Sequence, residues 1–456
     1  MMRRGCGWLI AAMAAVCLPG VAATQEAAQA KAPDAARMEQ IVESYVKSGQ
    51  FMGTVLVSED GHMVMDQGYG DADLEWQIPN SPEAKFRLGS MTKQFTSACI
   101  LLLEERGKLS TDDLVKKYLP DAPAAWDKIT IYNLLTHTSG IPNFTSFPDY
   151  HATEWKATTP AELVARFENK PLDFEPGAKF SYSNSNYVLL GYLLEKISGE
   201  SYQKFLEENI FDPLEMKDSG YDSNTAIILH RASGYTPGAK GPENAGYIDM
   251  SIPFSAGALY STTHDLLKWE EALFGGKVLS AAELKKMTTP YKDNYACGLE
   301  VQMISGHPRI WHNGGIEGFN TDMSYFPDEK LTVIVLANLN GGAADAIGED
   351  LGDVGLGVKV VLPSERKEIS LPAAALQPYV GTYQIAPTFS ITITLEGDQL
   401  MAQATNQPKF PLFAESPTEF FLKVVDAQVE FVKNDQGKVA YLILHQNGQN
   451  IQGMKQ

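Results

Sequence analysis

Ser90-Met91-Thr92-Lys93 is the stretch that decides the fold of this 456-residue chain. It is an S-x-x-K tetrad at the start of a helical pattern. From Gln94 to Arg106 apolar side chains recur about every 3.6 residues, and Gly107 follows where a glycine often ends a helix. Because residues three apart share a helix face, the Lys93 amine can reach the Ser90 hydroxyl and activate it as a nucleophile.

The tetrad has two partners further along the chain. Tyr182-Ser183-Asn184 is a Y-x-N motif, and His312-Asn313-Gly314 is an H-x-G motif. An S-x-x-K tetrad by itself recurs by chance on surface helices, where its serine and lysine have no special role. In penicillin-recognising serine enzymes, three motifs of these kinds follow one another in this order and meet in one cleft. The order and separation of the motifs therefore indicate an active site.

On these motifs the chain resembles the serine β-lactamase-like hydrolases. That family includes class C β-lactamases, D-Ala-D-Ala carboxypeptidases of the Y-x-N type, D-aminopeptidases and esterases. The resemblance runs from about residue 38 to about residue 350, with further matching stretches at 86–90, 134–140 and 210–214. It implies an α+β fold, in which an antiparallel sheet is flanked by helices and an all-helical region is inserted between the first and third motifs. Helical patterns that fit this insertion occur at 111–119, 160–169, 186–197 and 200–209.

Local patterns predict the sheet and its flanking helices. Met38 to Lys47 has a helical pattern, and Phe51 to Gly70 has the alternation and central turn of a hairpin. Arg309 to Trp311 and the apolar run Leu331 to Ala337 are expected strands, and Gly341 to Gly352 is an expected helix.

The composition changes near the C-terminus. Pro363, Pro372 and Pro378 interrupt the chain, and beyond them apolar residues alternate with polar ones between turns at 396–398, 434–437 and 446–448. This pattern predicts a small all-β barrel, which resembles the lipocalin-like module found on some members of the family. The predicted organisation is a signal peptide at 1–23, a linker at 24–37, a hydrolase domain at 38–360, a second linker at 361–374 and the barrel at 375–456.

The N-terminus has the features of an export signal. Arg3 and Arg4 precede a short apolar run, and Val21-Ala22-Ala23 fits a cleavage site, which predicts a periplasmic or secreted protein. An uncleaved membrane anchor is the alternative. No later apolar run is long enough to predict a further membrane span. With a formal net charge of −19, binding to nucleic acid is not expected. Beyond the leader the cysteines are Cys99 and Cys297, and Cys99 is expected to be a buried free thiol.

The resemblance implies a role for each motif residue. Ser90 would be the nucleophile, Lys93 its partner, and Tyr182 the group that moves the proton between Ser90 and the leaving group. The Lys93 ammonium is expected to favour the phenolate form of Tyr182. Whether the tyrosine or the lysine is the kinetic base remains open. Asn184 would orient Lys93 and contact a substrate carbonyl.

The same resemblance implies an oxyanion hole built from the backbone N–H groups of Ser90 and Gly315. Gly314 is expected to let the substrate approach the strand closely, because a side chain there would block it. His312 stands where many members have a lysine. A histidine is mostly neutral at pH 7, so the substitution weakens the expectation of efficient β-lactam hydrolysis. Arg309 is interpreted as a surface residue of the strand, with a role in binding a substrate carboxylate as the alternative.

Other sequence features give no second active site. Ser139 lies beside His137, but no acid completes a triad and no G-x-S-x-G motif is present, so this stretch is interpreted as a structural turn. The eight histidines show no metal-binding spacing, and no cofactor is predicted.

Together these observations predict an exported serine hydrolase that works through a Ser90 acyl-enzyme on a small-molecule or peptide substrate. The amide or ester that it cleaves would be a D-amino-acid peptide, a β-lactam or a small ester. The alternatives are a carboxylesterase on the same scaffold and a catalytically silent penicillin-binding-like protein. The oligomeric state stays open.

Overall fold

The computed structural model describes residues 34–456 except for 424–426, 435 and 447–448. The predicted leader and most of the first linker therefore lie outside the described residues. Among those that are described, no helix is long and apolar enough to cross a membrane.

The central element is a six-stranded antiparallel sheet with the order β10-β11-β12-β13-β1-β2. Its first and last segments in the chain are neighbours, because Leu56 of β1 pairs with Ile334 of β13. The predicted hairpin and the predicted strand at Leu331–Ala337 are thus both present. The strand bounds are Gly53–Glu59 (β1), His62–Tyr69 (β2), Glu300–Ile304 (β10), His307–Ile316 (β11), Phe319–Phe326 (β12) and Leu331–Ala337 (β13).

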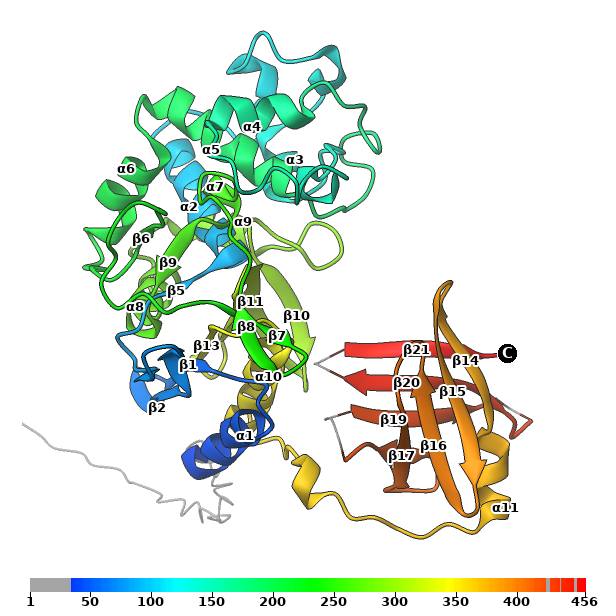
Figure 1. Cartoon of the computed structure of the whole chain (residues 1–456). Helices are drawn as coiled ribbons and strands as arrows, with labels where there is room; N and C mark the ends of the chain where they lie inside the picture. Colours follow the sequence, from blue (N-terminus) through cyan, green and yellow to red (C-terminus); the bar gives the residue numbers. More distant parts are fainter. Residues whose placement is uncertain (1–33, 424–426, 435, 447–448) are drawn as a thin grey trace, which may run out of the picture. The chain divides into compact units, whose positions relative to one another are not determined.

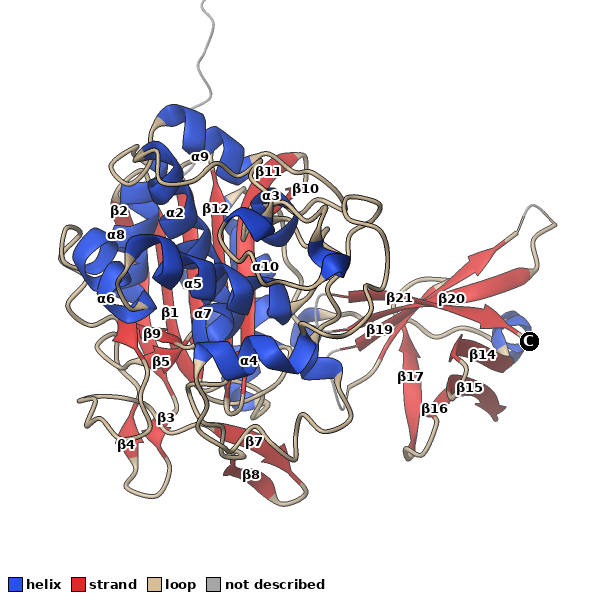
Figure 2. Ribbon diagram, turned by 90° about the horizontal axis from the view of Figure 1, so that it is seen from above, coloured by secondary structure: helices blue, strands red, loops and turns tan. Residues whose placement is uncertain are grey.

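Both faces of this sheet are covered. Successive side chains of a strand point to opposite sides, so one strand contributes residues to the apolar cores on both faces. Val55 packs in an apolar core with the helices α1 (Ala35–Lys47) and α10 (Ala343–Gly355), whereas Leu56 packs in the larger core on the other face. Figure 1 shows α1 beside α10, and Figure 2 shows the helices of the larger core gathered over the opposite face. A strand buried on both faces reads as a continuous apolar run, which is the pattern of Leu331–Ala337.

The chain between the first and third motifs is largely helical, as predicted. Short strands lie within this segment and in the chain just before it. Among them, β6 and β9 form a three-stranded sheet with β5, which precedes the first motif. The helices are α3 (Ile131–Leu135), α4 (Pro160–Phe167), α5 (Asn184–Ser198), α6 (Tyr202–Leu206), α7 (Phe254–Gly257), α8 (Thr263–Phe274) and α9 (Ala281–Thr288). The short strands are β3 (Asp71–Asp73), β4 (Ile78–Pro79), β5 (Phe86–Arg87), β6 (Gly220–Tyr221), β7 (Tyr235–Gly238), β8 (Gly241–Asn244) and β9 (Leu259–Ser261).

The helix predicted at 111–119 is wrong. This segment has one short 3-10 turn at Val115–Lys117, and Leu114 before it is extended. The backbone N–H of Val115 donates to the carbonyl of Ile129 at 2.9 Å, so the segment hydrogen-bonds to a distant stretch of chain. Long-range pairing has replaced the local hydrogen bonds that a helix would use.

The helix that carries the S-x-x-K tetrad is α2 (Thr92–Glu105), and it is buried on all sides from Thr92 to Leu103. Polar side chains on α2 have fixed partners. The indole N–H of Trp269 donates to Gln94 Oε1 at 2.7 Å, and Thr96 Oγ1 donates to the carbonyl of Ser255 at 2.7 Å. Cys99 is a buried free thiol, as predicted, and so is Cys297.

The C-terminal strands close into an eight-stranded antiparallel barrel, which confirms the prediction of a small β-barrel. Closure comes from pairing between its first and last strands, where Tyr383 lies opposite Lys455. A short helix, α11 (Ala373–Leu376), precedes it. The strands are Gly381–Ala386 (β14), Phe389–Glu396 (β15), Gln399–Ala404 (β16), Lys409–Ala414 (β17), Glu419–Phe421 (β18), Ala427–Lys433 (β19), Val439–Gln446 (β20) and Gln449–Lys455 (β21).

The barrel should be dispensable for folding of the rest, because its apolar core shares no residue with the two cores that flank the six-stranded sheet. A chain that ends after Lys367 keeps Leu362, which packs with α1 and α10, and Glu365, which pairs with Arg37. We expect its melting temperature to lie within about 5 °C of that of the full chain. A chain that ends after Val361 loses both contacts and should melt lower. Thermal denaturation followed by circular dichroism checks this, and aggregation of the longer truncation would contradict it.

Candidate functional site

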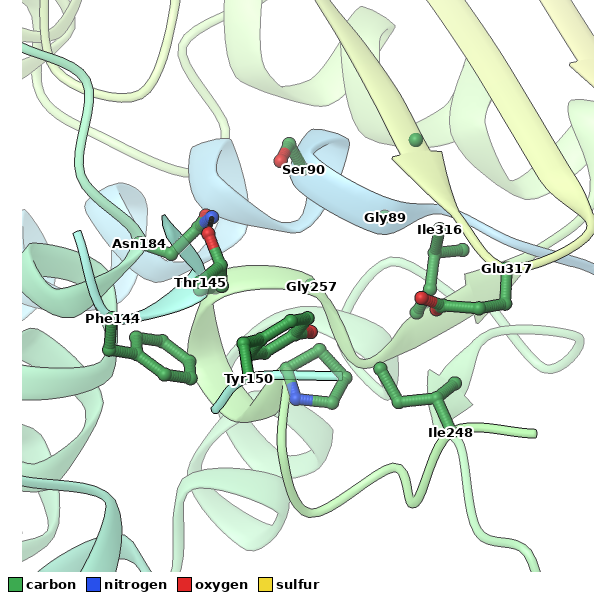
Figure 3. Close-up of a pocket in the computed structure, with 13 residues that line it drawn as sticks. Gly89, Ser90, Phe144, Thr145, Tyr150, Asn184, Ile248, Gly257, Ile316 and Glu317 are labelled. Carbon is green, nitrogen blue, oxygen red and sulfur yellow. Dashed lines mark hydrogen bonds between the residues drawn. The ribbon is translucent and has the colours of Figure 1, made fainter. Parts of the chain in front are cut away.

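Ser90 lies in a 3-10 turn, Gly89–Met91, directly before α2. Gly89 has a φ of +55°, a conformation that favours glycine, and it turns the chain from β5 into the helix. Ser90 is partly exposed and lines a cavity of about 180 Å³. Figure 3 shows its hydroxyl at the rim of this cavity, above Asn184 and Gly257. A serine at the start of a helix also lies at the positive end of the helix dipole.

Lys93 is fully buried directly behind Ser90. Its Nζ lies 2.9 Å from Ser90 Oγ, 2.9 Å from Asn184 Oδ1 and 2.8 Å from the carbonyl oxygen of Ala256. None of these partners carries a charge, and burial lowers the pKa of Lys93 well below its ordinary value. A neutral amine donates two protons and accepts one. It therefore fits two oxygens that only accept and one hydroxyl that can donate.

Asn184 is the first residue of α5, and its side chain is held in one orientation. Its Nδ2 donates to Thr145 Oγ1 at 3.1 Å, which leaves Oδ1 to face Lys93. Its backbone N–H donates to Asn143 Oδ1 at 3.0 Å, and Thr145 Oγ1 donates to the same oxygen at 3.0 Å. Asn143 and Thr145 were not predicted as site residues, although they lie shortly after the matched stretch at 134–140. No motif in the sequence marks them as neighbours of Asn184.

Tyr182 also lies beside Ser90, whose side chain acts to lower the pKa of the Tyr182 phenol. The Lys93 Nζ lies 4.9 Å from the centre of the Tyr182 ring. Burial raises the pKa of Tyr182 above its ordinary value. The expectation that the lysine charge would favour a phenolate is therefore wrong, because desolvation acts on both groups and favours the neutral form of each. Burial thus favours the phenol form of Tyr182 and the free amine of Lys93.

His137 supports Tyr182 from behind, with ring centres 4.3 Å apart. Its Nδ1 accepts hydrogen bonds from the backbone N–H of Ser183 and from Asn186 Nδ2, each at 3.2 Å, so the ring proton is on Nε2. Ser139 Oγ donates to Asn186 Oδ1 at 2.6 Å. This agrees with the interpretation of the stretch as a structural turn, because Ser139 is buried and engaged there.

His312 is buried beside the site and does not line the cavity. Its Nδ1 lies 2.6 Å from the carbonyl oxygen of Asn313 and therefore donates, while Nε2, at 3.1 Å from the hydroxyl of Tyr295, accepts. Burial, with a smaller effect of the nearby Lys93, lowers the pKa of His312 to about 3. His312 is therefore neutral at pH 7, as expected from the sequence, and both of its nitrogens are occupied.

Gly314 of the third motif and Gly315 directly after it have different functions in the fold. A Cβ on Gly314 would lie 1.9 Å from the carbonyl oxygen of Leu88, so this glycine lets β11 pack against the chain that leads into Ser90. From the sequence, Gly314 was expected to let a substrate approach the strand closely. Gly315, in contrast, lines the cavity, and its backbone lies against Gly89. The N–H groups of Ser90 and Gly315 thus come from adjoining backbone segments.

Arg309 is not a surface residue, and it does not line the cavity. It is 3% exposed and lies on the face of β11 opposite to His312. Its guanidinium donates to Asp322 Oδ2 and to Ser324 Oγ, both at 2.8 Å, on the neighbouring strand β12. The interpretation of Arg309 as a surface residue is therefore wrong, and its charge is already paired within the fold.

Several residues that line the cavity were not predicted as site residues from the sequence. Its described lining contains one charged side chain, Glu317, which directly follows β11. The other described lining residues outside the motifs are Gly89, Phe144, Thr145, Tyr150, Ile248, Pro253, Ala256, Gly257, Gly315 and Ile316. These residues come from loops and turns that only the tertiary fold brings together. Within the described part of the chain, no group of three or more His, Cys, Asp or Glu side chains is arranged to hold a metal ion.

Comparison with known families gives matches for both parts of the chain. Residues 38–354 match the Beta-lactamase family, and residues 365–455 match a family described as a domain of unknown function, DUF3471. A penicillin-binding protein of Bacillus subtilis (strain 168) is 28% identical over 444 residues, which cover 92% of this chain and 98% of that protein. A putative penicillin-binding protein of the same strain is 33% identical over 306 residues, covering 67% of this chain and 75% of that protein.

Two solved structures with the same fold are similar to this chain over most of its length. An octameric penicillin-binding protein homologue from Pyrococcus abyssi has a TM-score of 0.65 and 26% identity, and the match covers 92% of this chain and all of that one. A D-amino acid amidase from Ochrobactrum anthropi SV3 has a TM-score of 0.62 and 25% identity, with 70% of this chain and 97% of that chain covered.

Gly314→Ala should disturb the site through packing. The added methyl group would meet the Leu88 carbonyl, so the chain two residues before Ser90 must move. We expect a loss of at least about 2 kcal/mol in the free energy of unfolding. Gly246→Ala is the matched control, because its Cβ would have no heavy atom within 4 Å, and it should change stability by less than about 0.5 kcal/mol. Denaturant unfolding measures both, and equal stability of the two variants would refute the packing argument.

Proposed function

Because this chain belongs to the β-lactamase family, we propose that it is a serine hydrolase that cleaves amides or esters through an acyl-enzyme on Ser90. The observation that carries the proposal is the Lys93 amine, held 2.9 Å from Ser90 Oγ by two further contacts and buried from solvent. A serine hydroxyl needs a base at this distance to become a nucleophile.

Acylation follows from the placement of these groups. Ser90 Oγ attacks the substrate carbonyl carbon while its proton passes to Lys93 Nζ. The negative charge that develops on the carbonyl oxygen is stabilised by the backbone N–H groups of Ser90 and Gly315. The Tyr182 phenol protonates the leaving group as its bond to carbon breaks, and Lys93 returns the proton to Tyr182. In the second half, a water molecule attacks the acyl carbon and Ser90 regains its proton.

The protonation states support this division of roles. A lysine with an ordinary pKa would be an ammonium at pH 7 and could not accept the Ser90 proton. Burial among uncharged oxygens shifts Lys93 toward the free amine. Tyr182, whose pKa burial raises, keeps its proton until the leaving group needs it.

Support for the substrate class comes from relatives and from the cavity. One structural relative is a D-amino acid amidase, and others are described as penicillin-binding proteins. From these we propose small amides and esters, with D-amino-acid derivatives first among them. The neutral His312 and the paired Arg309 leave both without a role in binding a substrate carboxylate. This weighs against a β-lactam or a peptide C-terminus as the main substrate. The predicted leader supports the proposal that the enzyme acts outside the cytoplasm.

Ser90→Ala should abolish covalent labelling. We expect the wild-type protein to gain the mass of one organophosphonate when it is treated with a fluorophosphonate probe, because Lys93 activates Ser90. Intact-protein mass spectrometry followed by peptide mapping locates the adduct. Ser139→Ala, at the other serine that the sequence singles out, should keep the label. An adduct on any residue other than Ser90 would contradict the proposal.

The pH profile should report Lys93. With a neutral nitrophenyl ester, kcat/KM should fall as pH falls through the pKa of Lys93, because only the free amine accepts the Ser90 proton. Since burial lowers that pKa, the midpoint should lie well below the ordinary lysine value of about 10.5.

Lys93→Ala and Tyr182→Phe should each reduce kcat by about 1000-fold or more, and the double variant should be little worse. A midpoint near 10.5, or strictly multiplicative losses, would show that the two groups do not act in this way.

A further inference from the structure

The charge inside the cavity limits the substrate class. We propose that the site takes amide or ester substrates that carry a cationic amine, and that Glu317 binds this ammonium group. The inference rests on the proposed function, because it concerns the pocket in which Ser90 would be acylated. It is independent of how the proton moves between Lys93 and Tyr182.

Glu317 is placed by the turn between β11 and β12. It follows Gly315 by two residues, so it lies just beyond the backbone of the proposed oxyanion hole. The side chain of Asn340 fixes this turn. Its Oδ1 accepts a hydrogen bond from the N–H of Gly318 at 2.7 Å, and its Nδ2 donates to the carbonyl of Ile316 at 3.0 Å. Figure 3 shows the Glu317 carboxylate directed into the pocket, on the side opposite to Phe144.

Glu317 forms no ion pair with any described residue, although its side chain is partly buried in the cavity wall. Burial raises its pKa, and the nearby Glu154 adds to this effect. Arg87 is close enough to act in the opposite direction, but its Nε is bound to Asp222 at 2.6 Å. His151 pairs with Glu154 at 3.1 Å. An ammonium group in the cavity would provide the charge partner that the fold does not supply.

The rest of the cavity does not favour an anionic substrate. Its other described lining residues are uncharged, and Lys93 lies fully buried behind Ser90 with three oxygen partners. A substrate carboxylate would therefore meet Glu317 without meeting an available cation, and like charges in a partly desolvated pocket repel each other. The negative net charge of the whole chain, −19, also favours the approach of cations.

Much of the remaining cavity lining is apolar. Phe144, Tyr150, Ile248, Pro253 and Ile316 bring apolar surface to the cavity beside Ser90 and Glu317. A pocket with one carboxylate and apolar walls suits an amino acid whose α-amine is free and whose side chain is apolar. The substrate class is thus an amide or ester of such an amino acid, in contrast to an N-acylated one.

The test compares two substrates that differ only in this charge. Phenylalanine p-nitroanilide and its N-acetyl derivative, each as D and L enantiomers, are assayed with the full chain. We expect kcat/KM to be about 10- to 100-fold higher for the free amine of the preferred enantiomer, because its ammonium forms a charge-assisted hydrogen bond. In Glu317→Gln this ratio should fall to about one.

Two further variants make the result specific. Glu154→Gln removes the neighbouring acid, which does not line the cavity, and should keep the wild-type ratio within about threefold. Glu317→Lys should reverse the preference, so that the N-succinyl derivative becomes better than the free amine. Circular dichroism confirms that each variant is folded. A wild-type ratio near one, or an equal loss on both substrates in Glu317→Gln, would overturn the inference.

The outcomes also separate this inference from the proposed function. If a neutral nitrophenyl ester is hydrolysed with Ser90-dependent labelling but the amine ratio is near one, Glu317 does not select amines and the serine hydrolase proposal stands. If Ser90 is not labelled and no substrate turns over, the proposed function itself fails.

Discussion

A buried lysine surrounded by uncharged oxygens is the constraint on which the rest of this site depends. Lys93 receives one contact from the 3-10 turn before its own helix through Ser90, one from α5 through Asn184 and one from α7 through the carbonyl of Ala256. Three separate parts of the helical region must therefore meet at one amine. The free energy cost of burying an unpaired ammonium is what shifts this group toward the neutral form. Burial therefore favours the free amine, which is the form of Lys93 that can accept a proton.

The same fold contains a second buried basic side chain, Arg309, which keeps its positive charge. Arg309 meets a carboxylate, Asp322, and a guanidinium keeps its proton under all ordinary conditions. Its pairing holds β11 to β12, the strand pair that ends at the cavity. Lys93 lacks such a partner and is available for proton transfer. The partners thus distinguish the two residues. Arg309 is held as a cation by a carboxylate, whereas Lys93 is surrounded by neutral oxygens that favour its free amine.

Part of this arrangement could be predicted from the sequence. The proximity of Ser90 and Lys93 follows from helix geometry alone, and the covered sheet follows from the apolar run that ends at Ala337. The partner of Arg309 could not be predicted, because it depends on the pairing register of two strands. Glu317 gave no signal either, since nothing local distinguishes a cavity-lining glutamate from a surface one. The failed helix at 111–119 has a similar cause: its backbone bonds to residues far along the chain.

The strand β11 connects these features through its two faces. His312 and Gly314 lie on one face, toward the nucleophile segment, and Arg309 and Asn313 lie on the other. Inserting or deleting a single residue within the strand would exchange the faces. It would bring a guanidinium toward Ser90 and move the histidine to the opposite, equally buried face. The strand itself can therefore hardly change in length during evolution. The side chain of Glu317 lies beyond the strand and outside this alternation, so it can be replaced without shifting the residues around Ser90, and selectivity for new substrates can diverge there.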